Sequence, residues 1–387
     1  MARLPYLSSR LQGYQSTIFA EMSALAVRTG AINLGQGFPD TDGPAEVLEA
    51  AVAAIRSGTA NQYPPGIGIG ELRHAVARHQ KRFWGMDVDP DSEVLITAGA
   101  SEALAASILA LTEVGDDVLT FEPWYDLYGA VISMAGAVRK VVTLRPPDYG
   151  FDPDELAAAV TPRTRMLVLN SPHNPTGKVF SRAELEAIAE VAIERDLIVV
   201  TDEVYEHLVF HGEHIPIATL PGMADRTVTI SSGGKTFAVT GWKIGWVCAR
   251  PELVAAVRTA KQWLTYVSGG PFQHAIAAGL DLGDDYFTAQ AEDLRAKRDR
   301  LSEGLRSTGL EVFEPSGTYF ITADIRSIGY DDGIEFCWGL PERIGVAAVP
   351  NVVMYDNVHE GRHLVRFAFC KQHDVLDAAI ERLRTLA

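Results

Sequence analysis

The sequence predicts an α/β fold in which a large domain carries a mostly parallel, doubly wound sheet and a second, smaller domain is α+β. Three observations predict it. Between about residues 90 and 250, short apolar runs rich in β-branched residues alternate with helical patterns. Beyond about residue 280, a long charged helical pattern is followed by segments of alternating polarity. The length of 387 residues allows two or three domains at roughly 150 residues each.

Within the first region, Ser181 and Glu184 form a capping box that opens a helix at residues 183–195. Another helix is expected at residues 102–111. The run 197–200 is apolar throughout, which indicates a parallel strand covered on both faces. The expected strands are residues 93–97, 117–122, 166–170, 197–201, 227–231 and 244–249.

The second region is expected to hold a helix at 284–308, strands within 317–323, 346–349 and 363–369, and a last helix from residue 375. We therefore expect an N-terminal arm with part of the small domain at residues 1–35, the large domain at 36–280 and the small C-terminal domain at 281–387. The arm should pack on the small domain. Because no repeat or long linker separates these units, they should pack closely.

Composition and charge exclude several classes of protein. With 47% hydrophobic and 22% charged residues, the chain is neither disordered nor a disulfide scaffold. A net charge of −16 disfavours nucleic acids and anionic membranes as partners. No apolar run approaches the roughly 18 residues of a membrane span, and the N-terminus lacks an apolar signal region. Cys248, Cys337 and Cys370 are far apart, so we expect them in the core of a cytoplasmic protein.

One motif is suited to binding a phosphate group. Residues 94–104 (VLITAGASEAL) predict a strand, a turn of small residues and a helix. Gly99 and Ala100 let a ligand approach the backbone, and Ser101 offers a hydroxyl beside the free amides of the helix start. The same pattern is also typical of a plain strand-to-helix connection. Neither this segment nor residues 64–70 matches a nucleotide-binding fingerprint.

Two further clusters follow predicted strands. In residues 170–177 (NSPHNPTG), Asn170 and Asn174 bracket a proline-containing turn, which suits a ligand crevice but also an ordinary Asx-turn. Asp202 follows the buried run 197–201. An acid at that place is costly to bury without a cation, and a protonated pyridinium nitrogen would supply one.

The last cluster is residues 231–245 (SSGGKTFAVTGWKIG), which place Lys235 in a Gly-rich turn just after an apolar strand. Desolvation and nearby cations would lower the pKa of this amine and make it a nucleophile. Ser232 and Lys243 could add phosphate donors. A lone lysine is usually a surface residue, but this context favours the functional interpretation.

These motifs stand in the order found in one family. With NLGQGFPD (33–40), NQYPPGIG (61–68) and VRFAF (365–369), the whole chain resembles class I aminotransferases of fold-type I, which depend on pyridoxal 5′-phosphate. It is most similar to the branch with kynurenine aminotransferase, glutamine transaminase K, cysteine-conjugate β-lyase and succinyldiaminopimelate aminotransferase.

The resemblance implies a role for each cofactor-site residue. Lys235 would form the Schiff base with the cofactor and carry the proton between Cα and C4′. Asp202 would pair with the pyridinium nitrogen. Tyr205 and Asn174 would bind the phenolate oxygen. The remaining implied contacts are Tyr125 on the ring face, Asn170 near the ring, and Ala100, Ser101, Ser232, Lys243 and Tyr63 of a neighbouring subunit at the phosphate.

The resemblance also implies how substrate binds. Arg366 would hold the α-carboxylate through two parallel hydrogen bonds, assisted by Gly37 and Asn174. The alternative is that Arg366 pairs with an acid on the small domain's sheet. If Tyr63 completes the neighbouring site, the enzyme is a homodimer. The aromatic residues at 262–266 (QWLTY) would lie at that interface or in the core.

The predicted reaction moves an amino group from an L-amino acid to a 2-oxo acid by ping-pong kinetics. A cysteine-S-conjugate β-lyase using the same site is the first alternative. A regulator that only binds the cofactor is disfavoured, because NLGQGFPD begins at Asn33, which leaves no room for a preceding DNA-binding domain, and the surface is acidic.

The indications of the amino donor disagree. A pocket that includes Phe19 and Tyr125 favours apolar or aromatic donors. Residues 37–44 (GFPDTDGP) and 336–350 (FCWGLPERIGVAAVP) instead resemble the succinyldiaminopimelate enzymes, whose donor is long and acidic. Some kynurenine aminotransferases carry a tyrosine where this chain has Ser101, which favours a bulkier donor here.

Overall fold

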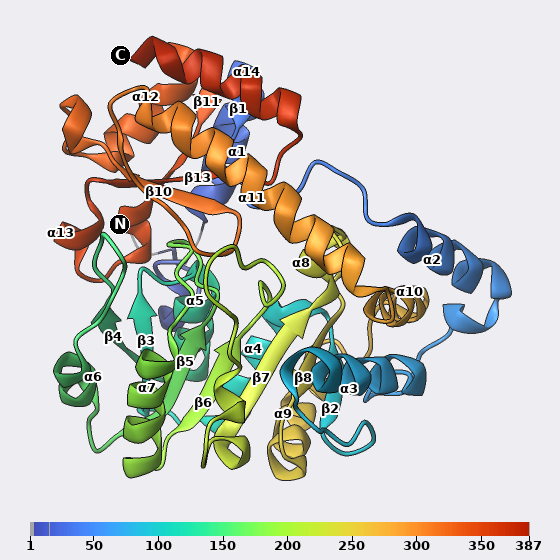
Figure 1. Cartoon of the computed structure of the whole chain (residues 1–387). Helices are drawn as coiled ribbons and strands as arrows, with labels where there is room; N and C mark the ends of the chain where they lie inside the picture. Colours follow the sequence, from blue (N-terminus) through green and yellow to red (C-terminus); the bar gives the residue numbers. More distant parts are fainter. Residues whose placement is uncertain (1–3, 15, 387) are drawn as a thin grey trace.

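A seven-stranded sheet forms the centre of the large domain in the computed structural model, which describes residues 4–14 and 16–386. Its strand order is β2-β8-β7-β6-β5-β3-β4, and only β8 runs antiparallel to its neighbours. In Figure 1 the arrows of the other strands of this sheet point towards the small domain, and β8 runs the opposite way. The strands are β2 (Val94–Thr97), β3 (Asp117–Glu122), β4 (Val138–Thr143), β5 (Thr164–Asn170), β6 (Ile198–Asp202), β7 (Thr227–Ser232) and β8 (Gly245–Cys248).

Helices cover both faces of this sheet, as a doubly wound fold requires. Successive residues of β5 alternate between the two cores: Met166 and Val168 pack with α4, α5 and α9, whereas Leu167 and Leu169 pack with α6 and α7. A further core joins α2, α3 and α10 to β2 and β8. These helices are α2 (Ala45–Ser57), α3 (Gly70–Trp84), α4 (Gly99–Leu111), α5 (Asp126–Ala135), α6 (Pro153–Ala159), α7 (Arg182–Glu194), α8 (Gly233–Thr236), α9 (Pro251–Leu264) and α10 (Gly270–Leu280).

The small domain holds a four-stranded antiparallel sheet of order β12-β13-β10-β9. The N-terminal arm packs on it as predicted: β1 pairs in parallel with β11, and Met22 and Leu25 of α1 are buried in its core. Long helix α11 joins the two domains (Figure 1). The elements are α1 (Ile18–Thr29), β1 (Ile32–Asn33), α11 (Asp284–Arg306), β9 (Glu311–Phe313), β10 (Phe320–Asp324), α12 (Gly333–Ile344), β11 (Val346–Ala347), β12 (Val349–Pro350), α13 (Val358–Gly361), β13 (Leu364–Ala368) and α14 (His373–Leu383).

The predicted strands and helices are present. The six predicted strands of the large sheet lie within two residues of their predicted ends, and the capping box of Ser181 and Glu184 opens α7. Strand β4 was missed because its centre, Arg139 and Lys140, is polar. The reversed direction of β8 was not predicted either. Its connection from β7 carries no helix long enough for the crossover that a parallel neighbour needs.

The three cysteines are free and buried, as predicted. No helix in the described part of the chain is long and apolar enough to cross a membrane. The core interpretation of residues 262–266 is wrong for Trp263, which is 83% exposed. The domain limits at residues 35 and 280 stay a prediction.

Candidate active site

A cavity of about 870 Å³ opens at the carboxyl ends of β5, β6 and β7, where ligands bind in open α/β sheets. Residues of both domains line it. The structure brings together every predicted site residue except Tyr63, namely Phe19, Gly37, Ala100, Ser101, Tyr125, Asn170, Asn174, Asp202, Tyr205, Ser232, Lys235, Lys243 and Arg366.

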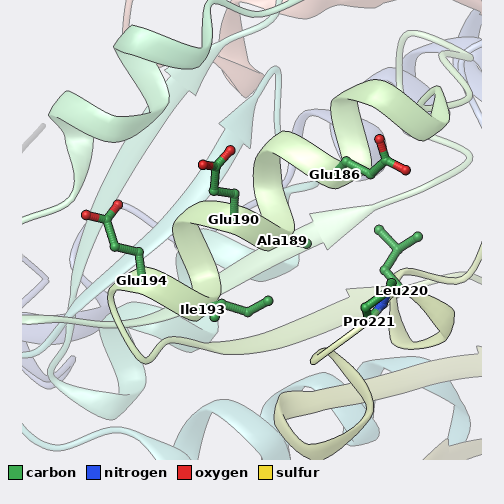
Figure 2. A pocket seen from close by; sticks show the side chains of 7 residues that line it. All are labelled: Glu186, Ala189, Glu190, Ile193, Glu194, Leu220 and Pro221. Carbon is green, nitrogen blue, oxygen red and sulfur yellow. The ribbon is translucent and has the colours of Figure 1, made fainter.

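A second hollow, of about 430 Å³, lies on the surface beside α7. Figure 2 shows its three glutamates, Glu186, Glu190 and Glu194, along the helix, with apolar side chains beside them. It contains no basic or nucleophilic side chain and shares no residue with the larger cavity. The larger cavity is therefore the candidate site.

The Lys235 side chain comes from α8, a single helical turn after β7 where an open Gly-rich turn was expected. A Cβ on Gly233 would lie 2.6 Å from Cδ1 of Ile276, so a larger residue at the start of this turn would displace the Ile276 side chain. Lys235 Nζ donates to the Tyr319 hydroxyl at 2.9 Å and to the Gly37 carbonyl at 3.4 Å. Burial lowers the pKa of Lys235 to about 8. At neutral pH a fraction of the molecules therefore carries an uncharged amine at this position, which can attack a carbonyl carbon.

Asp202 ends β6 and is buried. Its Oδ2 accepts a hydrogen bond from the Tyr128 hydroxyl at 2.7 Å, and its Oδ1 accepts from the Val204 amide at 3.4 Å. Burial raises the pKa of Asp202 to about 6, although these two hydrogen bonds act in the opposite direction. A cation beside this carboxylate would therefore bind strongly, as the sequence predicts.

Asn170, at the end of β5, is hydrogen-bonded both to the end of β6 and to Asn174. Asn170 Nδ2 donates to the backbone carbonyl of Asp202, and Asn170 Oδ1 accepts from the amide of Asn174, both at 2.7 Å. Asn170 therefore fixes the backbone from which Asp202 and Asn174 project. Its predicted contact with a ring stays a prediction.

One end of the cavity is suited to an anion. Lys243 Nζ donates to Ser101 Oγ at 3.0 Å, across the first turn of α4. A Cβ on Gly99 would lie 3.2 Å from the Lys243 side chain, which explains the glycine at this close approach. The free amides of the helix start, an ammonium group and the hydroxyls of Ser101 and Ser232 form a donor set that suits a phosphate.

Arg366 lies on β13, and its side chain is 2% exposed. Its Nη1 donates to Asn174 Oδ1 and its Nη2 to the Gly35 carbonyl, each at 2.9 Å. The guanidinium lies 4.8 Å from the Phe19 ring centre and 4.0 Å from that of Phe320. Among residues 4–14 and 16–386 it makes no ion pair with an acid, so the alternative of such a pair on the small domain's sheet is wrong. A buried guanidinium without an acid is suited to a substrate carboxylate.

Two phenols complete the lining. Tyr205 is buried, and its ring meets that of Tyr319 edge-on at 5.2 Å. Tyr125 lies at the start of α5, and burial raises its pKa to about 12. Burial likewise raises the pKa of Tyr205, so both hydroxyls are protonated hydrogen-bond donors at neutral pH.

Tyr63 does not line the cavity of its own chain. It is 82% exposed, and its ring meets that of Tyr266 at 5.7 Å. Trp263, which is also exposed, stands three residues before Tyr266. A contribution of Tyr63 to a site therefore requires a second copy of the chain.

The sequence reasoning missed Tyr128 and Tyr319. Tyr128 stands three residues after Tyr125, and a helix predicted over this segment would have placed both phenols on one side. Tyr319 comes from the small domain, and no local pattern brings it to Lys235. Only the tertiary fold does.

In the part of the chain that the structure describes, His79, Glu206 and His207 form one buried group of metal-ligand type. The Nε2 atoms of the two histidines lie 2.7 Å apart, which is a hydrogen-bond distance. Two imidazole ligands of one zinc ion lie about 3.3 Å apart, because each Zn–N bond is about 2.0 Å. His79 and His207 are therefore hydrogen-bonded to each other, with their nitrogens too close together to bind one zinc ion.

Comparisons with known proteins agree with this geometry. The family model for class I and II aminotransferases matches residues 29–383. A Mycobacterium tuberculosis protein named probable N-succinyldiaminopimelate aminotransferase is 55% identical over 390 residues, covering 98% of each chain. A methionine aminotransferase of Escherichia coli is 40% identical over 379 residues, again covering 98% of each chain.

A solved structure of N-succinyldiaminopimelate aminotransferase from M. tuberculosis superposes with a TM-score of 0.97 at 56% identity, covering 98% of this chain and 100% of that one. Family, fold and cavity agree. The chain belongs to the class I and II aminotransferases and is an amino-acid aminotransferase of fold-type I that depends on pyridoxal phosphate.

Proposed function

We propose that Lys235 is the catalytic amine of this aminotransferase, that Asp202 pairs with the ring nitrogen of the cofactor, and that Arg366 binds the substrate carboxylate. One observation carries the proposal. A half-buried amine, a buried acid and a buried guanidinium, the last two with no ion-pair partner among the described residues, line a single cavity. The donor set at the start of α4 fits the phosphate group.

Pyridoxal phosphate supplies an aldehyde that bonds amines and a ring that withdraws electrons from the substrate's Cα. The chain's own residues do the rest. Arg366 orients the α-carboxylate so that the Cα–H bond faces Lys235, whose Nζ takes the proton and later returns it. Asp202 would keep the ring nitrogen protonated. Tyr205 and Asn174 would donate hydrogen bonds to the phenolate oxygen of the cofactor, and Tyr125 would pack on the ring.

We propose N-succinyldiaminopimelate as the amino donor. The support is the 55% identity, over 98% of each chain, to the relative named for this substrate. A cavity of about 870 Å³ also leaves room for a long side chain.

A second candidate is a donor with an uncharged side chain, such as methionine. The specific observation in its favour is the charge of the lining. Its basic side chains are Lys235, Lys243 and Arg366, which already have roles, whereas Glu21 and Asp126 add negative charge. A distal carboxylate of the donor would need a cation from the partner subunit.

We also propose a cytoplasmic homodimer in which Tyr63 of each chain reaches the phosphate end of the other site. The exposed aromatic side chains of Tyr63, Trp263 and Tyr266 support an interface there. Three free, buried cysteines are in keeping with a reducing compartment. Sedimentation analysis of the purified enzyme tests the dimer.

The donor is tested by measuring kcat/KM of the holoenzyme for N-succinyldiaminopimelate, methionine and kynurenine, with 2-oxoglutarate as acceptor. The first donor should give the highest value. A higher value for methionine or kynurenine would select the second candidate. Release of pyruvate from a cysteine conjugate without any acceptor, at a rate matching transamination, would select the β-lyase. The Lys235→Ala variant controls for background in every assay.

A further inference from the structure

Tyr319 is a buried residue immediately before β10, and its hydroxyl contacts the amine of Lys235. Its hydroxyl accepts from Lys235 Nζ at 2.9 Å and donates to the Gly37 carbonyl at 2.7 Å. The ring is 1% exposed and is held edge-on between Tyr205 at 5.2 Å and Phe320 at 4.8 Å. The hydroxyl therefore has a fixed position.

The direction of these hydrogen bonds follows from the groups involved. A carbonyl can only accept, so the phenolic proton is committed to Gly37, and the Tyr319 oxygen can only accept from Lys235. Lys235 Nζ also faces the Gly37 carbonyl at 3.4 Å. An uncharged amine has two N–H groups and one lone pair. When the two N–H groups point to Tyr319 and Gly37, the lone pair points away from both.

We propose that Tyr319, with the Gly37 carbonyl, is the positioning site that holds the freed amine of Lys235 and directs its lone pair at the Cα proton of the amino donor. This inference rests on the proposed role of Lys235. It adds a residue of the small domain to the proton transfer. The lowered pKa of Lys235 is in keeping with it, because an uncharged amine is the form that takes a proton.

The backbone before Tyr319 provides an independent observation. Thr318 is fully buried and has φ of 65°, a left-handed conformation that a β-branched residue rarely adopts. The fold maintains it through a hydrogen bond from the Thr318 amide to the Leu208 carbonyl at 2.8 Å. Strained backbone of this kind is common at functional sites. Here the conformation of Thr318 sets the direction in which the Tyr319 side chain projects.

The test is Tyr319→Phe, which keeps the ring and removes the hydroxyl. In the cofactor-free protein, the pKa of Lys235 is measured from the pH dependence of acetic anhydride labelling, with mass spectrometry of the Lys235 peptide. The hydroxyl stabilises the ammonium form, so its loss should lower this pKa by about one unit. In the holoenzyme, kcat should fall about tenfold or more. The primary isotope effect with Cα-deuterated donor should rise, because proton transfer becomes slower.

Tyr355→Phe is the matched control, because Tyr355 is buried but does not line the cavity. It should leave the labelling pKa and the isotope effect unchanged. Circular dichroism and cofactor content verify that both variants fold. If Tyr319→Phe keeps the parent kcat, isotope effect and labelling pKa, the inference is wrong, while an inactive Lys235→Ala would leave the proposed function intact. If Lys235→Ala keeps the parent turnover, the proposed function itself fails.

Discussion

Replacing Arg366 with lysine tests the carboxylate site most directly. The guanidinium already makes two hydrogen bonds, to Asn174 and Gly35, and two further N–H groups are needed to hold a carboxylate by parallel bonds. A lysine ammonium has three N–H groups and no planar fork, so at least one of these four bonds is lost. A hydrogen bond to a charged group contributes about 2 kcal/mol, which predicts a loss of about thirtyfold in kcat/KM.

The assay is the rate of the first half-reaction, followed by the change in cofactor absorbance as the donor concentration is varied. Arg362→Lys is the control, because Arg362 lies near the same strand but its side chain is 58% exposed. That variant should match the parent. If Arg366→Lys loses less than about threefold while cofactor content is unchanged, Arg366 does not bind the carboxylate.

Three other substitutions test the rest of the site. Lys235→Ala should abolish turnover and the near-visible absorbance of the lysine-bound cofactor, which a spectrum of the purified protein shows. Tyr128→Phe removes a hydrogen bond that lowers the pKa of Asp202, so in the cofactor-free protein the upper end of the pH range over which Asp202 lowers the free energy of unfolding should move up by about one unit, measured by urea unfolding; an unmoved range would contradict this. Tyr63→Phe should weaken cofactor binding about tenfold in equilibrium dialysis without dissociating the dimer, and unaltered binding would exclude Tyr63 from the phosphate site.

The parts of the fold that the sequence predicts are those with strong local patterns. Apolar, β-branched runs such as β6 are recognisable because burial on both faces requires an unbroken run. Strand β4 lies at the edge of the sheet and carries Arg139 and Lys140, so burial leaves a weaker pattern there. The direction of β8 depends on the connection from β7, not on the residues of the strand itself.

The site residues that the sequence predicts also depend on local patterns. Lys235, Asp202 and Asn174 each stand at the end of a strand or just beyond it, and parallel strands bring such ends to one edge. The approach of Tyr319 to Lys235 depends on the packing of two domains, so the sequence gives no signal of it. The role proposed for Tyr63 depends in turn on a second copy of the chain, which no pattern within one sequence places.

The buried charge of Asp202 reduces the stability of the folded protein. Burial raises its pKa from 3.8 to about 6, so the folded cofactor-free protein loses stability as the pH rises from about 4 through 6, and the loss levels off near 3 kcal/mol. Asp202→Asn keeps an acceptor for Tyr128 but carries no charge. The free energy of unfolding of the cofactor-free variant should therefore equal that of the parent near pH 4 and exceed it by about 3 kcal/mol near pH 8, measured by urea unfolding. A difference that does not change with pH would show that the buried charge of Asp202 carries no such cost. Saturating cofactor should reduce this difference in the free energy of unfolding. A protonated ring nitrogen beside Asp202 would stabilise the carboxylate of the parent, whereas the asparagine of the variant carries no charge to stabilise.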